Sequence, residues 1–235
     1  MTGAAGVTES TAPFQGAGPG PTPRAALHAI QVRPIPFTAA KDLLVRHHYL
    51  HSLPGGTRLA FGVFVGRSLL GALTLGVGPA NAHRLVEAAI PDDCMTLTRL
   101  WLSDELPPNS ESRIIGVSLR ALRLHTNIRF LLSYADPSAG HVGTIYQATG
   151  WLYTGLSEQM PLYDLGDGVV RHSRSLSHAY GTHSVTHFRS HGVDIQVLPQ
   201  SAKHRYLHFL DPAWLSRLRV PVLPYPKREA GCEGR

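Results

Sequence analysis

The 235-residue sequence contains few cysteines and no long apolar run. Its two cysteines, Cys94 and Cys232, form no Cys-x-x-Cys pair and indicate no disulfide framework. No apolar stretch approaches the roughly 18 residues that a membrane-spanning helix needs. Residues 1–22 lack the basic start and the apolar segment of a signal peptide. These absences predict a cytoplasmic protein with no membrane partner.

Charge is distributed unevenly along the chain. Residues 1–167 contain 12 Lys and Arg against 12 Asp and Glu, whereas residues 168–235 contain 10 against 4, together with seven of the 14 histidines. A neutral segment followed by a basic one predicts chemistry in the first and contact with a polyanion in the second. A solvated basic tail explains the same charge equally well. The candidates for DNA contact, mostly cations, are Arg171, Arg174, Arg189, Lys203, Arg205 and Tyr206.

The pattern of apolar residues divides the chain into three parts. Residues 1–27 have few large apolar groups and are predicted to be disordered. Residues 28–167 carry strand and helix signals in the order β-α-β-β-β-α-β-α-β-β, which predicts an α/β domain with a mixed central sheet flanked by helices. Residues 168–235 are predicted to form a small basic α+β extension.

The expected elements follow from periodicity and from turn residues. Strands are expected at 28–35, 58–65, 69–76, 95–102, 128–135, 151–156 and 160–165. Helices are expected at 39–48 with Thr38 as its N-cap, from 107–110 to about 126, and at 140–149. In the extension we expect two short helices within 176–190, strands at 193–199 and 204–210, and a last helix at 212–219.

The segment from Arg46 to His51 concentrates three imidazoles and one phenol. Such groups supply general bases, metal ligands or stacking surfaces. His48 and Tyr49 are therefore candidate catalytic residues, and His48, His51 and Asp136 are a candidate metal-binding set. The alternative is a polar helix end, where the helix dipole favours histidine.

A predicted strand that leads into a helix N-terminus marks a second segment. Free backbone N–H groups and the positive end of the helix dipole make such a turn a site for a pyrophosphate or another anion. The alternative is ordinary capping by Asn109 or Ser110. The candidate residues for binding a cofactor are Ser110, Ser112, Arg113 and Gly116.

The third segment is the apolar strand that ends at Asp136, ten residues before Tyr146. Sheets of α/β proteins place ligands at the carboxyl ends of their strands. Asp136 is suited to accept a hydrogen bond from an adenine amino group or to act as a base, and Tyr146 to donate a proton. The alternative is that Asp136 is a turn residue and Tyr146 a core residue.

Taken together and in this order, the segments resemble the Mom family of phage DNA-modification proteins. The resemblance covers about residues 28–227 and is most specific in Ser133–Pro137 and Gly140–Gln147. It also includes residues 47–51, 61–63, 97–101, 109–112, 203–206 and 224–227.

The resemblance implies a GNAT-like, acyltransferase-like fold. It also implies the conversion of adenine in duplex DNA to an N6-carbamoylmethyl (acetamido) derivative, which protects phage DNA from host restriction. Acetyl-CoA or a related acyl donor and an iron ion are the implied cofactors. The matching functional positions are His48, Tyr49, Arg99, Asp136 and Tyr146, with Ser112 as a weaker match.

Two other functions are compatible with the sequence. One is a GNAT-type N-acetyltransferase that uses acetyl-CoA on an amine of a small molecule or a protein. The other is a non-catalytic DNA-binding protein. A homodimer is one of the oligomeric states that the sequence leaves open.

Overall fold

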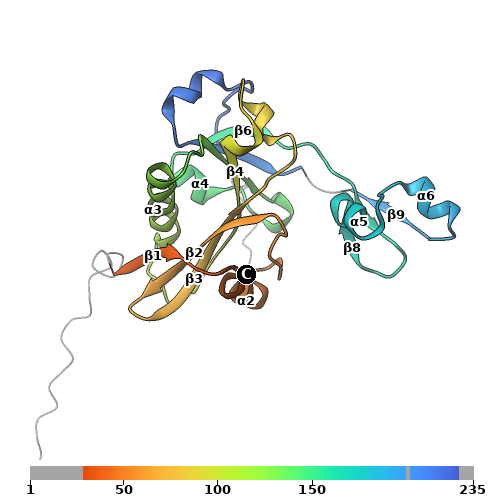
Figure 1. Ribbon diagram of the computed structural model, residues 1–235, viewed down its shortest axis with the longest axis horizontal. Coiled ribbons are helices and arrows are strands. Elements are labelled where there is room, and N and C mark those ends of the chain that lie inside the picture. Colours follow the sequence, from red (N-terminus) through yellow and green to blue (C-terminus); the bar gives the residue numbers. More distant parts are fainter. Residues whose placement is uncertain (1–28, 200–201, 228–235) are drawn as a thin grey trace, which may run out of the picture.

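The computed structural model describes residues 29–199 and 202–227. Figure 1 shows a main body built on a sheet and a smaller module that stands to one side of it. The segment expected to be disordered, residues 1–27, lies outside the described residues, as does Cys232. Within the described part of the chain, no helix is long and apolar enough to span a bilayer.

The main body contains a seven-stranded sheet in the order β1-β2-β3-β4-β5-β10-β6. Neighbouring strands are antiparallel, except that β4 and β5 run parallel. The predicted mixed α/β architecture is therefore confirmed. The strands are β1 (Ile30–Pro34), β2 (Thr57–Val65), β3 (Ser68–Gly76), β4 (Cys94–Leu102), β5 (Phe130–Ala135), β6 (Leu152–Leu156) and β10 (His204–Phe209).

Helices cover both faces of this sheet because successive strand residues point to opposite sides. Phe61 and Val63 share one apolar cluster with α3 (Ser110–His125) and with Tyr146 of α4 (Thr144–Ala148). Ala60 instead packs on the face that α2 (Phe37–His47) covers.

The expected N-cap of α2, Thr38, is wrong. The helix begins two residues earlier than expected, at Phe37 after Pro36, and has no side-chain cap. The fixed φ of a proline ring is compatible with this entry into a helix.

The parallel pair β4 and β5 diverges after a short contact. Their register runs from Cys94–Phe130 to Thr96–Leu132, and the Ser133 hydroxyl then donates a hydrogen bond to the Leu97 carbonyl at 3.2 Å. Beyond that point β4 continues beside β3, and β5 continues beside β10. The carboxyl ends of the two strands therefore face a shared region of the main body, which the loops after α2 and β5 enter.

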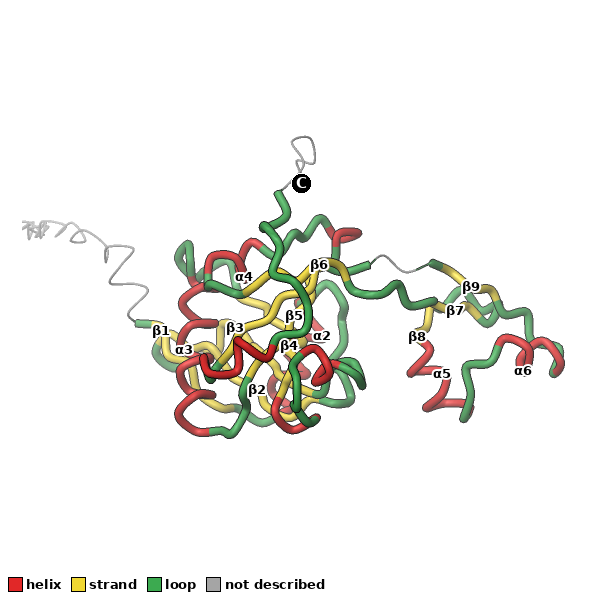
Figure 2. Tube along the Cα trace, turned by 90° about the horizontal axis from the view of Figure 1, so that it is seen from above, coloured by secondary structure: helices red, strands yellow, loops and turns green. Residues whose placement is uncertain are grey.

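A small module interrupts the main body between β6 and β10. Its sheet has the order β8-β7-β9, and Tyr163, Leu176, Phe188 and Ile195 form its own apolar core. Figures 1 and 2 show it beside the main body. Its elements are β7 (Leu162–Asp164), β8 (Val170–His172), α5 (Ser173–Tyr180), α6 (Val185–Ser190) and β9 (Gln196–Leu198).

This insertion corrects the expected division of the chain at residue 168. The strand expected at 160–165 forms, but it belongs to the module and not to the central sheet. The chain then returns, and β10 lies between β5 and β6 because its buried Tyr206 and Leu207 complete both apolar faces of the sheet. The last segment also packs on the main body, where Leu223 N–H donates to the Tyr153 carbonyl at 2.9 Å.

Short 3-10 helices make up much of the remaining chain. Residues 77–94 contain two of them. The four are η1 (Ala82–Leu85), η2 (Pro91–Asp93), η3 (Pro137–Ala139) and η4 (Pro212–Arg217).

Candidate active site

The loop after α2 is held against β4 by Arg99. The Arg99 guanidinium donates from Nε to the Ser52 carbonyl at 3.1 Å and from Nη2 to the Ser52 hydroxyl at 3.2 Å. Burial lowers the pKa of Arg99, and the nearby Tyr49 opposes this shift. An arginine stays protonated throughout the physiological range, so Arg99 supplies a fixed positive charge and fixes the loop that carries His48 and Tyr49.

His48 is a neutral, buried imidazole. Its side chain is largely enclosed, and its Nδ1 accepts a hydrogen bond from the Leu50 N–H at 3.1 Å. The proton of the neutral ring is therefore on Nε2. Burial, with added repulsion from Arg99, His51 and His141, lowers the pKa of His48 to about 4. The ring stacks on Tyr49 with centroids 4.5 Å apart.

Tyr49 lies next to His48 with about half of its surface exposed. Partial burial raises the pKa of its hydroxyl, the Asp136 carboxylate raises it further, and Arg99 lowers it. The charges of Arg99 and Asp136 therefore act on the same phenol, although Arg99 lies in β4 and Asp136 directly follows β5. Its ring also contacts His141, with centroids 5.7 Å apart at 58°.

Asp136 follows directly after β5 and caps η3. One carboxylate oxygen accepts from the Ser138 N–H at 3.0 Å and from the Ser138 hydroxyl at 2.6 Å. The other forms an ion pair with Lys203 Nζ at 3.1 Å. The turn role considered for Asp136 is thus real, and it fixes the carboxylate beside the phenol of Tyr49.

Tyr146 is enclosed by the aromatic core. Its ring contacts Trp151 and Tyr206, with centroids 5.2 and 5.3 Å away. Burial raises the pKa of its hydroxyl to about 12, while a side-chain hydrogen bond with Ser133 lowers it. The phenol is therefore protonated at physiological pH and lies within electrostatic range of Tyr49. It is placed to hold or donate a proton.

The candidate metal-binding set does not assemble. His48 Nδ1 is occupied by Leu50, the His51 ring bonds through Nδ1 to the Val45 carbonyl at 3.0 Å, and Asp136 is paired with Lys203. Across residues 29–199 and 202–227, no group of three histidine, cysteine or carboxylate side chains is arranged to hold a metal ion. These residues do not fit an iron ion, so no step is derived through one.

The start of α3 fits a coenzyme pyrophosphate only in part. A cavity of about 270 Å³ lies there, and Arg113 Nε is buried with no hydrogen-bond partner in the described structure. The Ser110 hydroxyl, however, donates to the Pro107 carbonyl at 2.6 Å, and the carboxylates of Asp104 and Glu111 line the cavity. Ser112 is half-buried, and a Cβ at Gly116 would meet open space. Because carboxylates repel phosphates, no step is derived through acyl-CoA here.

Most of the residues predicted to contact DNA have other partners. Tyr206 is fully buried, which excludes it from a surface contact. Arg205 donates to the Thr154 hydroxyl and carbonyl, both at 2.9 Å, and Arg171 forms an ion pair with Asp167 at 2.5 Å. Arg189 of α6 is exposed, and the side chain of Arg174 is outside the description.

The basic excess also lies elsewhere than expected. The inserted module, residues 162–198, contains three arginines, no lysine, three aspartates and five histidines. Its formal charge is therefore balanced. The positive excess belongs to residues 199–235, which contain seven Lys and Arg against three Asp and Glu.

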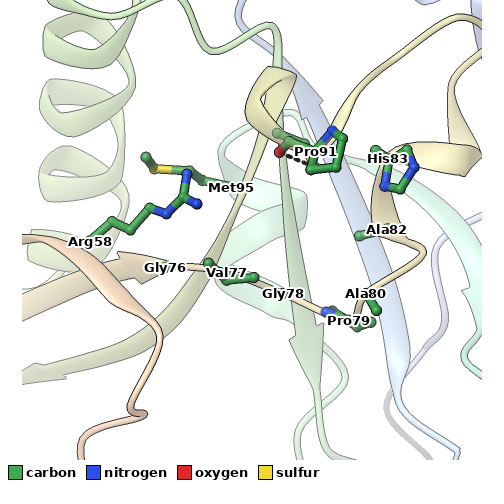
Figure 3. A pocket seen from close by; sticks show the side chains of 11 residues that line it. Arg58, Gly76, Val77, Gly78, Pro79, Ala80, Ala82, His83, Pro91 and Met95 are labelled. Carbon is green, nitrogen blue, oxygen red and sulfur yellow. Dashed lines mark hydrogen bonds between the residues drawn. The ribbon is translucent and has the colours of Figure 1, made fainter.

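A separate cavity of about 50 Å³ lies at the other end of β4 (Figure 3). It holds one or two water molecules at most. Cys94 lines it, and burial raises the pKa of this thiol to about 11. A protonated thiol is a poor nucleophile, so this cavity is not the reactive site.

Two residues that the sequence did not place in the site contribute to it. His141 was read as part of a motif but given no role, and Lys203 was assigned to DNA although it pairs with Asp136. Gly140 and Gly143, which flank His141 with positive φ of 72° and 77°, were a usable signal for an ordered turn. No local signal points to the Lys203 pairing, because 67 residues separate the partners.

The sequence of the chain matches a known protein family. Residues 29–227 match the Mom protein family. The chain is 31% identical over 210 residues to the methylcarbamoylase Mom of Escherichia phage Mu, which covers 84% of both chains.

Solved structures with a similar arrangement share little sequence. An acetyltransferase from Salmonella typhimurium that modifies the N-terminal serine of a ribosomal protein has 8% identity and a TM-score of 0.46 (77% of this chain, 95% of that chain). An N-acyl amino acid synthase from uncultured soil microbes has 15% and 0.43 (81% and 95%). A probable GNAT-family acetyltransferase from Chromobacterium violaceum has 10% and 0.42 (77% and 88%).

Proposed function

The chain belongs to the Mom protein family, and on this premise we propose that it is a transferase that converts adenine in duplex DNA to its N6-carbamoylmethyl derivative. The phage Mu relative is named a methylcarbamoylase. The observation that carries the proposal is the convergence of Tyr49, Asp136 and Tyr146 where β4 and β5 diverge, with Arg99 fixing the loop. The modified adenine protects phage DNA from restriction in the host cytoplasm.

The reaction forms a bond between adenine N6 and a methylene carbon. The N6–H proton passes to the Asp136 carboxylate, and the bond from the methylene to its leaving group breaks with both electrons going to that group. Adenine N6 is a weak nucleophile because its lone pair is delocalised into the ring. Asp136 accepts a hydrogen bond from N6–H, and Tyr146 provides a proton for the leaving group.

The donor must present an activated carbamoylmethyl group. Acyl transfer from acetyl-CoA would leave an N6-acetyl group instead, which has no N–CH2 bond. An acyl-CoA-related donor stays a prediction, because the residues at the start of α3 fit a coenzyme pyrophosphate only in part, whereas the described residues around His48 do not fit an iron ion.

Access to N6 requires the base to leave the duplex, because stacking and pairing shield it. Tyr49 is aromatic and half-exposed, and the Asp136 carboxylate is close enough to raise the pKa of its hydroxyl. It provides a surface on which an extruded base stacks. His48 supports the Tyr49 ring from one side by stacking on it.

The inserted module provides a second contact with the duplex. Arg189 and four histidines in or next to α5 and α6 are exposed on it: His178, His183, His187 and His191. It stands away from the main body in both views (Figures 1 and 2). We propose that the exposed Arg189 of the module contacts backbone phosphates of the duplex without reading sequence.

Nucleoside mass spectrometry tests this function. DNA from cells that express the protein is digested, and deoxyadenosine carrying an added acetamide group is quantified. We expect the adduct from the wild type and a loss of about 100-fold or more in Asp136→Asn. Asp42→Asn, an exposed aspartate on α2, is the matched control and retains the adduct.

The same measurement separates the alternatives. An N6-acetyl adduct would replace the carbamoylmethyl donor by an acyl donor. The absence of any deoxyadenosine adduct from folded wild-type protein would contradict the proposal. Release of thiol from acetyl-CoA with an amine substrate would then indicate an N-acetyltransferase, and DNA binding alone a non-catalytic protein.

A further inference from the structure

His141 is an exposed imidazole on a tightly held loop. The backbone N–H of His141 donates to the Asp136 backbone carbonyl at 3.1 Å. The backbone carbonyl of the next residue, Val142, accepts from Gln147 Nε2 at 3.1 Å and from the Tyr206 hydroxyl. Tyr206 is fully buried in β10. The loop backbone is therefore connected to the core of the main body, and its conformation does not depend on the imidazole.

The close approach at Gly143 holds this loop further. Its φ is +77°, and an added Cβ would lie 2.4 Å from the Tyr206 ring. Gly140, on the other side of His141, also has a positive φ but has open space around it. The loop thus packs against Tyr206 on one side and presents His141 on the other.

The imidazole faces the reactive residues. The centroids of the His141 and Tyr49 rings lie 5.7 Å apart, and the Tyr49 ring in turn stacks on His48 with centroids 4.5 Å apart. His141 is also close enough to add to the electrostatic shift on His48. Among the residues that the structure describes, the His141 side chain forms no hydrogen bond, and it is solvent-exposed. An ordered aromatic group that the fold does not use is available to a ligand.

We infer that His141 and Tyr49 form the two aromatic walls between which the extruded adenine stacks. The inference rests on the proposed function and names the residues that receive its substrate. A base between two rings needs them about 7 Å apart, twice an aromatic stacking distance. The ring centroids now lie 5.7 Å apart with an interplanar angle of 58°. Rotation of the two exposed side chains increases this separation to about 7 Å, while the hydrogen-bonded loop backbone keeps the rings opposed. Asp136, which directly precedes η3, then lies at the edge of the base.

Stacking predicts a specific pattern of variants. His141→Ala removes one wall, and we expect adduct formation to fall roughly 10- to 100-fold. His141→Phe keeps an aromatic face without a titratable nitrogen and restores most of the activity. His125→Ala, at the exposed end of α3, is the matched control and has no effect. The thermal unfolding midpoint is unchanged in all three, because the loop is held by its backbone.

A binding measurement tests the inference without the chemistry. Purified protein is titrated with two single-stranded oligonucleotides, one with a single adenine among abasic positions and one fully abasic. The wild type and His141→Phe bind the adenine-containing strand more tightly, roughly tenfold, and His141→Ala loses this preference.

Equal preference in wild type and His141→Ala would overturn the inference, as would a folded His141→Phe that behaves like His141→Ala. Wild-type protein that shows the adenine preference but forms no adduct in cells would instead contradict the proposed function and leave the base-stacking role supported.

Discussion

Acidification should destabilise this protein through His48. The unfolded chain has a histidine pKa near 6.5, whereas burial and the neighbouring cations lower the folded value to about 4. Between these values the unfolded state binds a proton that the folded state excludes, so the free energy of unfolding decreases as the pH decreases. The contribution is fully present above pH 6.5 and is lost as the pH decreases toward 4.

The size of the effect follows from the shift. Each pKa unit corresponds to about 1.4 kcal/mol, which sets an upper limit of about 3.5 kcal/mol for His48. The neighbouring Tyr49 is half-exposed, so water reaches this region and screens part of the charge. We therefore expect about 1–2 kcal/mol.

Comparison with His48→Asn isolates this contribution. The asparagine oxygen replaces Nδ1 as the acceptor for the Leu50 N–H but does not titrate in this range. Urea unfolding followed by circular dichroism gives the free energy at a series of pH values for both proteins. His204 and His208, whose pKa values burial also lowers, titrate in both and cancel in the difference. A wild-type-minus-variant difference that does not change with pH would refute the reasoning.

Three further predictions concern the site and the module. Tyr146→Phe removes the proposed proton donor and one hydrogen bond to Ser133, so adduct formation falls at least tenfold while urea unfolding shows a loss of only about 1 kcal/mol; an unchanged adduct yield would exclude the donor role. Gly143→Ala destabilises the fold by about 2–4 kcal/mol because its Cβ would lie 2.4 Å from the Tyr206 ring, whereas Gly140→Ala, with similar φ and open space, costs about 1 kcal/mol in the same assay; similar losses would argue against the contact. Arg189→Gln weakens duplex binding equally for all sequences and reduces the salt dependence of the binding constant by about one counterion; titrations at several salt concentrations check this, and an unchanged slope would remove Arg189 from the interface.

The predicted elements of the main body were close to the observed ones. Nearly continuous apolar runs mark β2 and β3, and the stripe of Ile114, Ile115, Leu119 and Leu122 marks α3. Such patterns are local, because a strand or helix buries one face whatever partner it packs against. The site residues themselves stay predictions: Asp136 directly follows the clearly marked strand β5, and Tyr146 lies in α4 ten residues later.

The roles of cations were much less predictable. Lys203, Arg205 and Arg171 were all assigned to DNA, but they pair with Asp136, Thr154 and Asp167. A cationic side chain bonds to whatever acceptor the fold brings near it. That acceptor lies close in sequence for Arg171 but on distant strands for the other two.

The sequence by itself determined the kinds of element, the mixed α/β class and, through its family resemblance, the residues His48, Tyr49, Arg99, Asp136 and Tyr146. Only the tertiary structure decided that β10 crosses back between β5 and β6, which turns an expected C-terminal extension into an insertion. It also decided that Lys203 meets Asp136 and that His141 faces Tyr49. Periodicity records which face of an element is buried, whereas strand order and side-chain partners depend on long-range pairing that neighbouring residues do not encode.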